Sequence, residues 1–139
     1  MLLFFWILFY FANNIVGDDY LNYYYRKNRL FLYWHVGKFV FEYQKKYPNT
    51  YGKLSSFLQY YFGMTNLFSL KKIIEMERFY IYFPIYNNNL EKLDWDYYLE
   101  LIKIKNCCLR MIYYKIAIFS ECDFDTFKSL LLEKNFFLN

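Results

Sequence analysis

Residues that form turns, cross-links and metal sites are scarce in this 139-residue sequence, which has 4 Gly, 2 Pro, 3 Cys and 1 His. So few Gly and Pro exclude collagen-like and low-complexity chains, which those residues dominate. Cys107 and Cys108 are adjacent and Cys122 stands alone, a spacing that fits neither a disulfide framework nor a zinc site. We therefore expect a reducing compartment, no metal, no cofactor, and three free cysteines buried in helices.

Apolar residues, in contrast, are abundant: 58% of the chain is hydrophobic and 27% is aromatic. This content supports a core and excludes an intrinsically disordered chain, and the length suits one domain. Phe, Tyr, Ile, Asn and Lys together supply 71 of the 139 residues. All five have A/T-rich codons, so the aromatic excess indicates an A+T-rich source and is weak evidence for base stacking or sugar binding.

The chain opens with an unbroken apolar run, Leu2–Ala12. A membrane-spanning helix needs roughly 20 such residues, so this run is too short to cross a membrane. No cationic side chain precedes Arg26, whereas a secretory signal begins with a basic region. We interpret residues 1–17 as a buried leading segment or the product of a mis-assigned start codon. Residues 18–139 are then expected to form a cytoplasmic domain with no membrane contact.

Beyond this segment, apolar residues recur at helical spacing, and no stretch alternates as a half-buried strand would. Capping and breaking residues divide the pattern into separate helices. The predicted helices cover residues 20–46, 54–62, 70–83 and 95–105, with one after Asn106 and a last one after Asp123. The predicted fold is all-α, a compact bundle of about five to six helices.

The boundaries of these helices follow from side-chain chemistry, because short polar side chains cap helix starts and Gly or Pro ends helices. The expected caps are Asp18 or Asp19, Ser69, Asp94, Asn106 and Asp123. The expected stops and breaks are Pro48, Gly52, Gly63 and Pro84. Residues 85–93, IYNNNLEKL, are predicted to be a loop.

Helical spacing also predicts which side chains face inward. In residues 20–46 a polar stripe of His35, Lys38, Glu42 and Lys45 lies opposite Leu30, Tyr33, Trp34 and Phe41. In the helix after Asn106, the predicted core positions are Leu109, Ile112, Tyr113 and Ile116. In the last helix they are Phe124, Phe127 and Leu131.

Positive charge is concentrated in the first half of the chain. Residues 20–81 hold ten Lys/Arg and three Asp/Glu, whereas residues 82–139 hold seven against eight. The basic half contains two helices joined by a short turn, 54–62 and 69–83, as in a helix-turn-helix. On the second helix Ser69 is the cap, and the charged residues are predicted to share one face: Lys71, Lys72, Glu75 and Arg78. Contact with DNA phosphates would explain this face, and so would a solvated surface with Lys71–Glu75 and Glu75–Arg78 pairs.

Six ordered fragments of the sequence, LYWHVGKFVFEYQ, YGKL, FG, FSLKKIIEMERFYIYFP, LDWDYYLELIKI and RMIY, resemble the amino-terminal domain of YhcG-type proteins. The resemblance covers about residues 20–135. It implies a helical domain thought to bind DNA, which in predicted bacterial nucleases precedes a PD-(D/E)xK nuclease domain. The residues that match the family pattern are Tyr33, Trp34, Gly37, Phe79, Tyr80, Pro84, Trp95 and Arg110. For the aromatic ones, core packing is the favoured interpretation.

Some positions depart from the family pattern. Glu77 stands where the family tends to have Arg, which adds a negative charge to the expected reading helix. Tyr97 replaces a His, Asp94 replaces a capping Ser, and His35 replaces an acidic residue on the polar stripe.

The carboxylates and lysine of a PD-(D/E)xK metal site are not found in a strand context after residue 94, so we expect no catalysis by this chain. The leading hypothesis is a DNA-binding or targeting module that uses Ser69, Lys71, Lys72 and Arg78 on double-stranded DNA. One alternative is a protein–protein module that forms a homo-oligomer or recruits a separate nuclease subunit. The other is a truncated remnant of a full-length nuclease gene, which a nuclease half in the downstream DNA would reveal.

Overall fold

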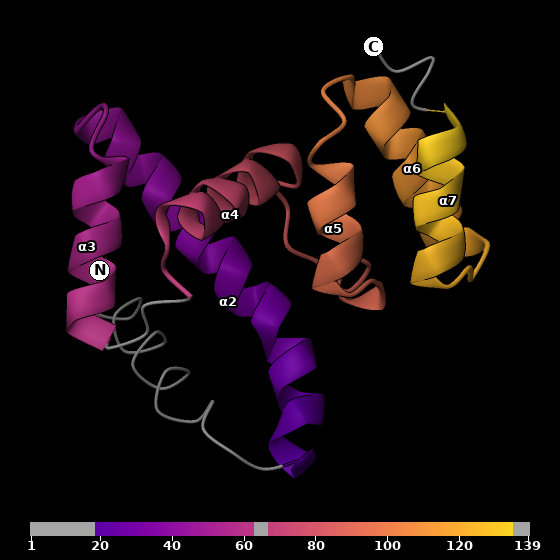
Figure 1. The fold of residues 1–139 in the computed structure, drawn as a ribbon, viewed down its shortest axis with the longest axis horizontal. Coiled ribbons are helices and arrows are strands. Elements are labelled where there is room, and N and C mark those ends of the chain that lie inside the picture. Colours follow the sequence, from indigo (N-terminus) through magenta and orange to yellow (C-terminus); the bar gives the residue numbers. More distant parts are fainter. Residues whose placement is uncertain (1–18, 63–66, 135–139) are drawn as a thin grey trace. The chain divides into compact units, whose positions relative to one another are not determined.

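The computed structural model describes residues 19–62 and 67–134, with side chains described for residues 29–60 and 67–133. This part of the chain contains six α-helices, one 3-10 turn and no strand (Figure 1). The predicted all-α fold is confirmed. The chain divides into two units, Met1–Tyr86 and Asn87–Asn139. The expected leading segment, residues 1–17, lies outside the described residues, as do the boundary residues Asp18 and Gly63.

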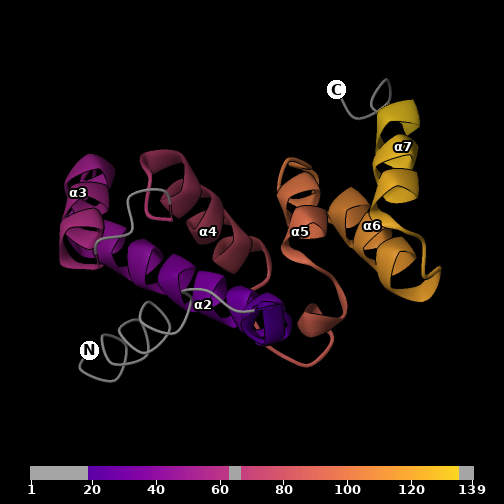
Figure 2. The ribbon, with the colours of Figure 1, turned by 60° about the horizontal axis from the view of Figure 1, so that its bottom comes forward.

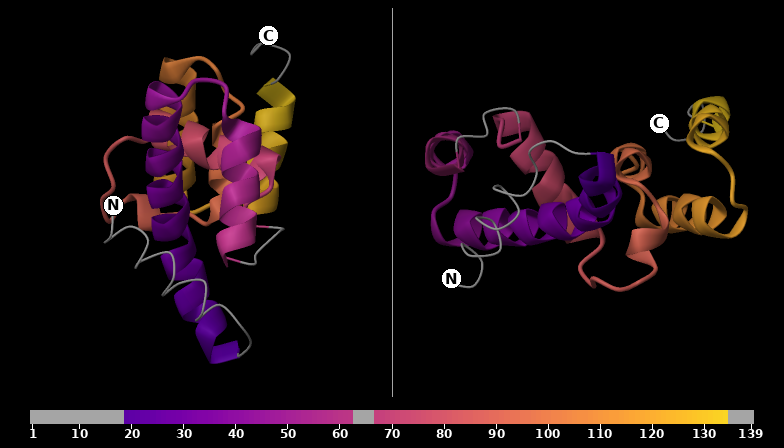
Figure 3. Two further views of the ribbon diagram at one scale, coloured as in Figure 1. Left: turned by 90° about the vertical axis from the view of Figure 1, so that its left-hand side faces the viewer. Right: turned by 90° about the horizontal axis from the view of Figure 1, so that it is seen from below.

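The first unit consists of helices α2 (Asp19–Lys46), α3 (Tyr51–Phe62) and α4 (Leu70–Tyr82). Figures 1 and 3 show α4 lying across the long helix α2, with α3 beside the carboxyl-terminal part of α2. Helix α4 makes most of its packing contacts with α2 and fewer with α3. The contact between α2 and α4 is therefore the main interface of this unit.

The two helices cross at Gly37 with almost no space between their backbones. A Cβ atom added to Gly37 would lie 2.0 Å from the carbonyl oxygen of Met76 and 3.1 Å from the Cβ of Tyr80. Near the end of α4, the indole Nε1 of Trp34 donates a buried hydrogen bond to the carbonyl oxygen of Phe83 at 2.8 Å. Only a glycine permits this approach, and the Trp34 bond fixes the position of α4 along α2.

The core of the first unit is formed by apolar side chains from all three helices and from Phe68, which precedes α4. Buried residues include Leu30, Val36, Val40, Leu54, Leu58, Phe68, Ile73, Met76 and Phe79. Between α3 and the start of α4, the Ser55 hydroxyl donates to the carbonyl oxygen of Phe68 at 2.6 Å. This bond satisfies a buried backbone acceptor that no helix pairs.

Helix α3 begins earlier than predicted, at Tyr51, so Gly52 lies inside its first turn and does not break the chain. The reversal after α2 occurs at Pro48 and Asn49, and Asn49 adopts a left-handed φ of 61°. The carbonyl of Thr50 already accepts the amide of Leu54 at 2.9 Å. The chain therefore leaves α2 and reverses at Pro48 and Asn49, and Gly52 is a residue of the next helix.

The second unit contains the 3-10 turn η1 (Leu90–Lys92) and helices α5 (Trp95–Leu101), α6 (Cys107–Phe119) and α7 (Phe124–Lys134) (Figure 2). Helices α6 and α7 both pack against α5. The hydroxyl of Tyr98 donates to the carbonyl oxygen of Leu90 at 2.6 Å, which ties η1 to α5. The predicted loop over residues 85–93 thus contains a short helical turn whose Leu90 is buried.

Arg110 is a buried cation on α6, with 6% of its surface exposed. Its Nη1 donates to the carbonyl oxygen of Ile104 at 2.6 Å and reaches that of Lys105 at 3.5 Å. Helix α5 ends at Leu101, four residues before the predicted end at Lys105. Arg110 therefore supplies hydrogen bonds to carbonyls in the connection between α5 and α6.

Three of the predicted caps accept backbone amide bonds. Ser69, Asn106 and Asp123 accept from the amides of residues 72, 109 and 126, at 3.4, 3.1 and 2.7 Å. Asp94 occupies the cap position of α5 without a side-chain hydrogen bond. Helix α2 begins at Asp19, so Asp19 is a residue of the helix and not its cap.

Two predictions about burial in the second unit are wrong. Cys107 and Cys108 are exposed and Cys122 is half-buried, although all three are free as expected. Ile112 is 53% exposed, while its neighbour Tyr113 is buried. Helix α6 buries a narrow stripe formed by Arg110, Tyr113 and Ala117, and Ile112, beside that stripe, faces solvent.

Within the described residues, no helix has the length and apolar character needed to cross a membrane.

Replacing Gly37 with alanine should destabilise the first unit by about 3 kcal/mol or more, because the new Cβ meets backbone atoms that cannot rotate away. Gly52→Ala is the matched control, since a Cβ there has nothing within 4 Å. It should stabilise the protein by about 0.5–1 kcal/mol, the usual gain of Ala over Gly in a helix. Urea unfolding followed by circular dichroism measures both. Equal stability of the two variants would contradict the close crossing.

Replacing Arg110 with alanine should destabilise the second unit by about 2–3 kcal/mol, because the variant leaves buried carbonyl oxygens without their charged donor. Hydrogen exchange read by mass spectrometry should show faster exchange of amides in residues 87–139. Lys103→Ala is the control, because the Lys103 side chain is 68% exposed and its 2.9 Å ion pair with Glu100 is a local contact within one helical turn, worth about 0.3–0.5 kcal/mol. If both variants exchange alike, Arg110 does not hold the connection between α5 and α6.

Candidate nucleic-acid interface

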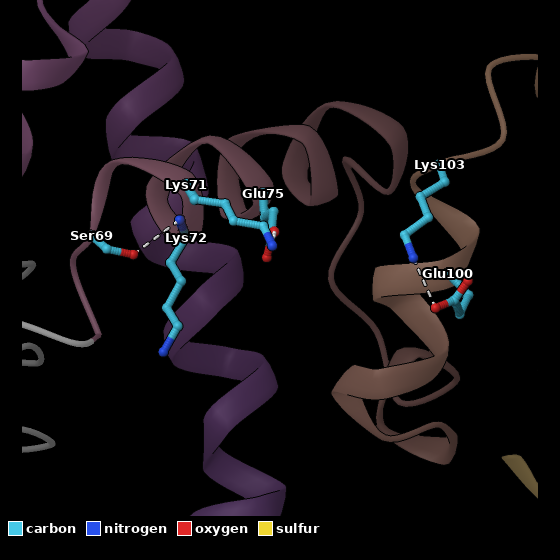
Figure 4. Close-up of polar contacts among 6 residues, drawn as sticks. All are labelled: Ser69, Lys71, Lys72, Glu75, Glu100 and Lys103. Carbon is cyan, nitrogen blue, oxygen red and sulfur yellow. Dashed lines mark hydrogen bonds and ion pairs between the residues drawn. The ribbon is translucent and has the colours of Figure 1, made fainter.

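The exposed side of α4 begins at Ser69, which lies at the N-cap position. Its Oγ accepts the backbone amide of Lys72 at 3.4 Å (Figure 4). Lys71 and Lys72 occupy the first turn, which contains no acidic residue. Both lysines are exposed, as is Arg78 two turns further along the helix. The first turn of α4 therefore presents two ammonium groups to solvent.

The charged residues of α4 do not all point the same way. Lys71 Nζ lies 3.8 Å from the Glu75 carboxylate, and the Lys71 side chain is 87% exposed. Figure 4 shows the Lys72 side chain leaving the helix in a different direction from this pair. The predicted Lys71–Glu75 pair is thus confirmed, whereas no ion pair joins Glu75 to Arg78 among the described side chains.

Exposed pairs of this type contribute only about 0.3–0.5 kcal/mol. The Lys71–Glu75 contact is therefore weak, and Lys71 can exchange its carboxylate partner for another anion at little cost.

Glu77 does not belong to this solvent face, although it lies on the same helix. It is buried, with 8% of its surface exposed, and its Oε1 accepts the hydroxyl of Tyr51 on α3 at 2.6 Å. Burial and this hydrogen bond raise the pKa of Tyr51 to about 12. The second carboxylate oxygen, Oε2, is buried without a hydrogen-bond partner. The negative charge expected on the reading helix is therefore directed into the protein.

Sequence reasoning missed Tyr51 as the partner of Glu77. The two residues are 26 positions apart on different helices, so neither helical spacing nor capping chemistry links them. The available signal was helical spacing: Glu77 follows the apolar residue Ile73 by four positions, which places it on the inner side of α4.

The aromatic residues of the family pattern form the core, as expected. Tyr33, Trp34, Phe79 and Trp95 are all less than 9% exposed. Tyr80 is half-buried, and its ring packs edge-on against Trp34 with centroids 5.1 Å apart. None of the four buried rings presents a face to a ligand.

The remaining residues of the family pattern, Gly37, Arg110 and Pro84, contribute to the fold. Gly37 lies at the crossing of α2 and α4, and Arg110 bonds the connection between α5 and α6. Pro84 is exposed just after the C-cap residue Phe83, so it follows the end of α4 as predicted.

His35 is half-buried on α2, where its ring centroid lies 4.2 Å from that of Phe31 and 4.9 Å from that of Trp34. Burial lowers the pKa of His35, and the charge of Lys38 lowers it further. The polar stripe predicted on α2 is thus partly covered at this end. Among residues 29–60 and 67–133, no group of three His, Cys, Asp or Glu side chains could hold a metal ion.

Comparison with known proteins places the chain in a family. A family model described as the DUF1016 N-terminal domain matches residues 25–137, and no further domain is matched in this sequence. No curated protein and no solved structure matches the chain. The chain belongs to the DUF1016 N-terminal domain family, which is the amino-terminal part of YhcG-type proteins.

Proposed function

We propose that this chain is a DNA-binding module that places the amino-terminal turn of α4 on the phosphate backbone of a duplex. The observation that carries the proposal is the pair of exposed lysines, Lys71 and Lys72, in a first turn without a carboxylate. Helix amino termini carry a partial positive charge, so cations there are unfavourable and anions are favourable. Phosphate groups of a duplex would relieve this repulsion, and each ammonium group could donate hydrogen bonds to a phosphate on its own side of the helix.

The distribution of charge supports the same partner. The unit Met1–Tyr86 contains ten Lys/Arg and five Asp/Glu, whereas the unit Asn87–Asn139 contains seven against eight. Since Glu77 is directed toward Tyr51, the outer side of α4 carries Lys71, Lys72 and Arg78 against Glu75 alone. A basic surface on one unit is the electrostatic footprint expected of a nucleic-acid-binding protein.

In this proposal α3 and α4 act as the helix-turn-helix pair, with α4 as the docking helix. The module supplies targeting, and cleavage belongs to a nuclease domain or separate nuclease subunit of the kind that the YhcG-type resemblance implies. Only the DUF1016 N-terminal domain is matched in this chain.

A second function, protein–protein association, is favoured by exposed apolar residues in the second unit. On α6, Ile112 is 53% exposed and Phe119, two turns away, is 78% exposed. On α7, Leu132 is 61% exposed. Exposed apolar residues at helical spacing suit a second copy of the chain or a nuclease subunit.

The DNA-binding proposal predicts affinity for a labelled DNA duplex that falls steeply between about 50 and 200 mM salt, because phosphate contacts release counterions. Fluorescence anisotropy measures the affinity. Lys71→Ala/Lys72→Ala/Arg78→Ala should weaken binding and reduce the salt slope by about 2–3, roughly 0.9 for each lost phosphate contact.

The matched control for this experiment is Lys92→Ala/Lys105→Ala/Lys115→Ala, which removes the same charge from exposed positions of the second unit. The control should change the salt slope of binding by no more than the amount expected for about one phosphate contact. Circular dichroism should show that the original chain and both variants are helical. A folded chain that ignores DNA at every salt concentration would reject the proposal. Oligomers that Phe119→Ser disrupts in sedimentation experiments would then support the association function.

A further inference from the structure

A cavity of about 700 Å³ lies between the carboxyl-terminal part of α2 and the beginning of α3. Its walls combine aromatic rings with charged side chains, among them Tyr43, Tyr47, Phe57, Glu42, Lys46 and Lys53. Cavities of this size hold small organic ligands in other proteins. None of these six side chains lies on α4, which carries Lys71 and Lys72, so the cavity is a separate feature of the first unit.

Two rings of the cavity leave aromatic surface open to solvent, and a third contacts one of them at a tilt of 47°. Tyr43 and Tyr47 are one helical turn apart, with ring centroids separated by 5.0 Å. Tyr47 is 47% exposed and Phe57, on the facing helix α3, is 41% exposed. Solvent therefore reaches aromatic surface on both sides of the opening, and planar bases stack on such rings in single-strand-binding proteins.

The charged groups complement these rings. Lys46 and Lys53 are exposed, and neither forms an ion pair with a described carboxylate. Lys46 Nζ lies 5.6 Å from the centroid of the Tyr47 ring, so one ammonium is held beside the stacking surface. The Glu42 carboxylate, also on the cavity wall, can accept hydrogen bonds from an amino group.

From this combination we infer that the cavity binds an unpaired nucleotide. The base stacks against Tyr47, its exocyclic amino group donates to Glu42, and its phosphate binds the ammonium groups of Lys46 and Lys53. An apolar peptide helix would use the rings and leave the three charged groups without partners. The nucleotide is either free or part of a single strand, because both present the same base and phosphate.

This inference does not depend on duplex binding by α4. Isothermal titration of the full chain with AMP and with a hexamer of deoxyadenosine nucleotides distinguishes the two sources. Equal dissociation constants assign a free nucleotide, whereas tighter binding of the hexamer assigns a single strand, because the two lysines then contact successive phosphates. If neither AMP nor the hexamer produces a heat of binding, the inference is overturned.

Tyr47→Ala should weaken binding of the better probe roughly 5- to 150-fold, the range found when a stacking ring is removed. Tyr47→Phe retains the ring and should bind like the original chain. Tyr60→Ala is the matched control, because Tyr60 lies on α3 at 88% exposure and away from the cavity wall. Equal losses in Tyr47→Ala and Tyr60→Ala would overturn the assignment to this cavity.

Two further variants separate this site from the face of α4. Lys46→Ala/Lys53→Ala should weaken both probes while preserving the helical circular dichroism spectrum. Lys71→Ala/Lys72→Ala/Arg78→Ala should leave AMP binding unchanged. Loss of AMP binding in the second variant alone would overturn the inference, since the nucleotide would then occupy α4.

Discussion

The backbone contact between α2 and α4 at Gly37 is the constraint on which the first unit depends. No side chain fits between Gly37 and the Met76 carbonyl, because a Cβ there would lie 2.0 Å from that oxygen, so the two helix backbones are in direct contact at this point. The bond from Trp34 to the carbonyl of Phe83 then fixes the end of α4. A helix held at both points can direct only one side to the core, so the outward position of Lys71 and Lys72 is a consequence of the crossing.

The orientation of α4, with one side directed to the core, also explains why the carboxylate of Glu77 is buried. With Ile73, Met76 and Phe79 directed into the core, Glu77 falls at the edge facing α3, where Tyr51 donates to it at 2.6 Å. An arginine, which the YhcG-type pattern favours here, would need different partners at this buried position. The difference between this chain and the family pattern therefore affects packing between α3 and α4, and leaves the solvent side of α4 basic.

Features decided by local chemistry could be predicted from the sequence. The helices, their order, and the caps at Ser69, Asn106 and Asp123 depend on residues a few positions apart. Features decided by tertiary contacts could not. Helix α5 ends at Leu101, and in the connection after it the carbonyl of Ile104 accepts a hydrogen bond from Arg110 on the next helix. In the sequence, a glycine such as Gly52 predicts a break between helices. Only the structure, with open space around Gly52, shows that this glycine lies within a helix.

The candidate interface was predictable to a similar extent. The cluster of lysines at the start of α4 is visible in the sequence, because a capping serine followed by Lys71 and Lys72 needs no tertiary information. The inward direction of Glu77 and its pairing with Tyr51 were not visible, because they depend on how α3 packs. Periodicity also failed at Ile112, since a helix that buries a narrow stripe exposes the residue beside it.

The aromatic content of the sequence is weak evidence for base stacking, whereas the position of a few aromatic rings in a cavity supports it. A high aromatic content distributed by base composition predicts rings everywhere. In the described part of the first unit, five rings are buried in the core: Tyr33, Trp34, Phe68, Phe79 and Phe83. Tyr43 and Tyr47 differ because they line the cavity between α2 and α3, where 47% of the surface of Tyr47 is exposed. Ring surface in a cavity beside Lys46 and Lys53 is a recognition chemistry that composition cannot specify. At the proposed nucleotide site, ring surface and cations are available to a ligand because Tyr47, Lys46 and Lys53 are exposed.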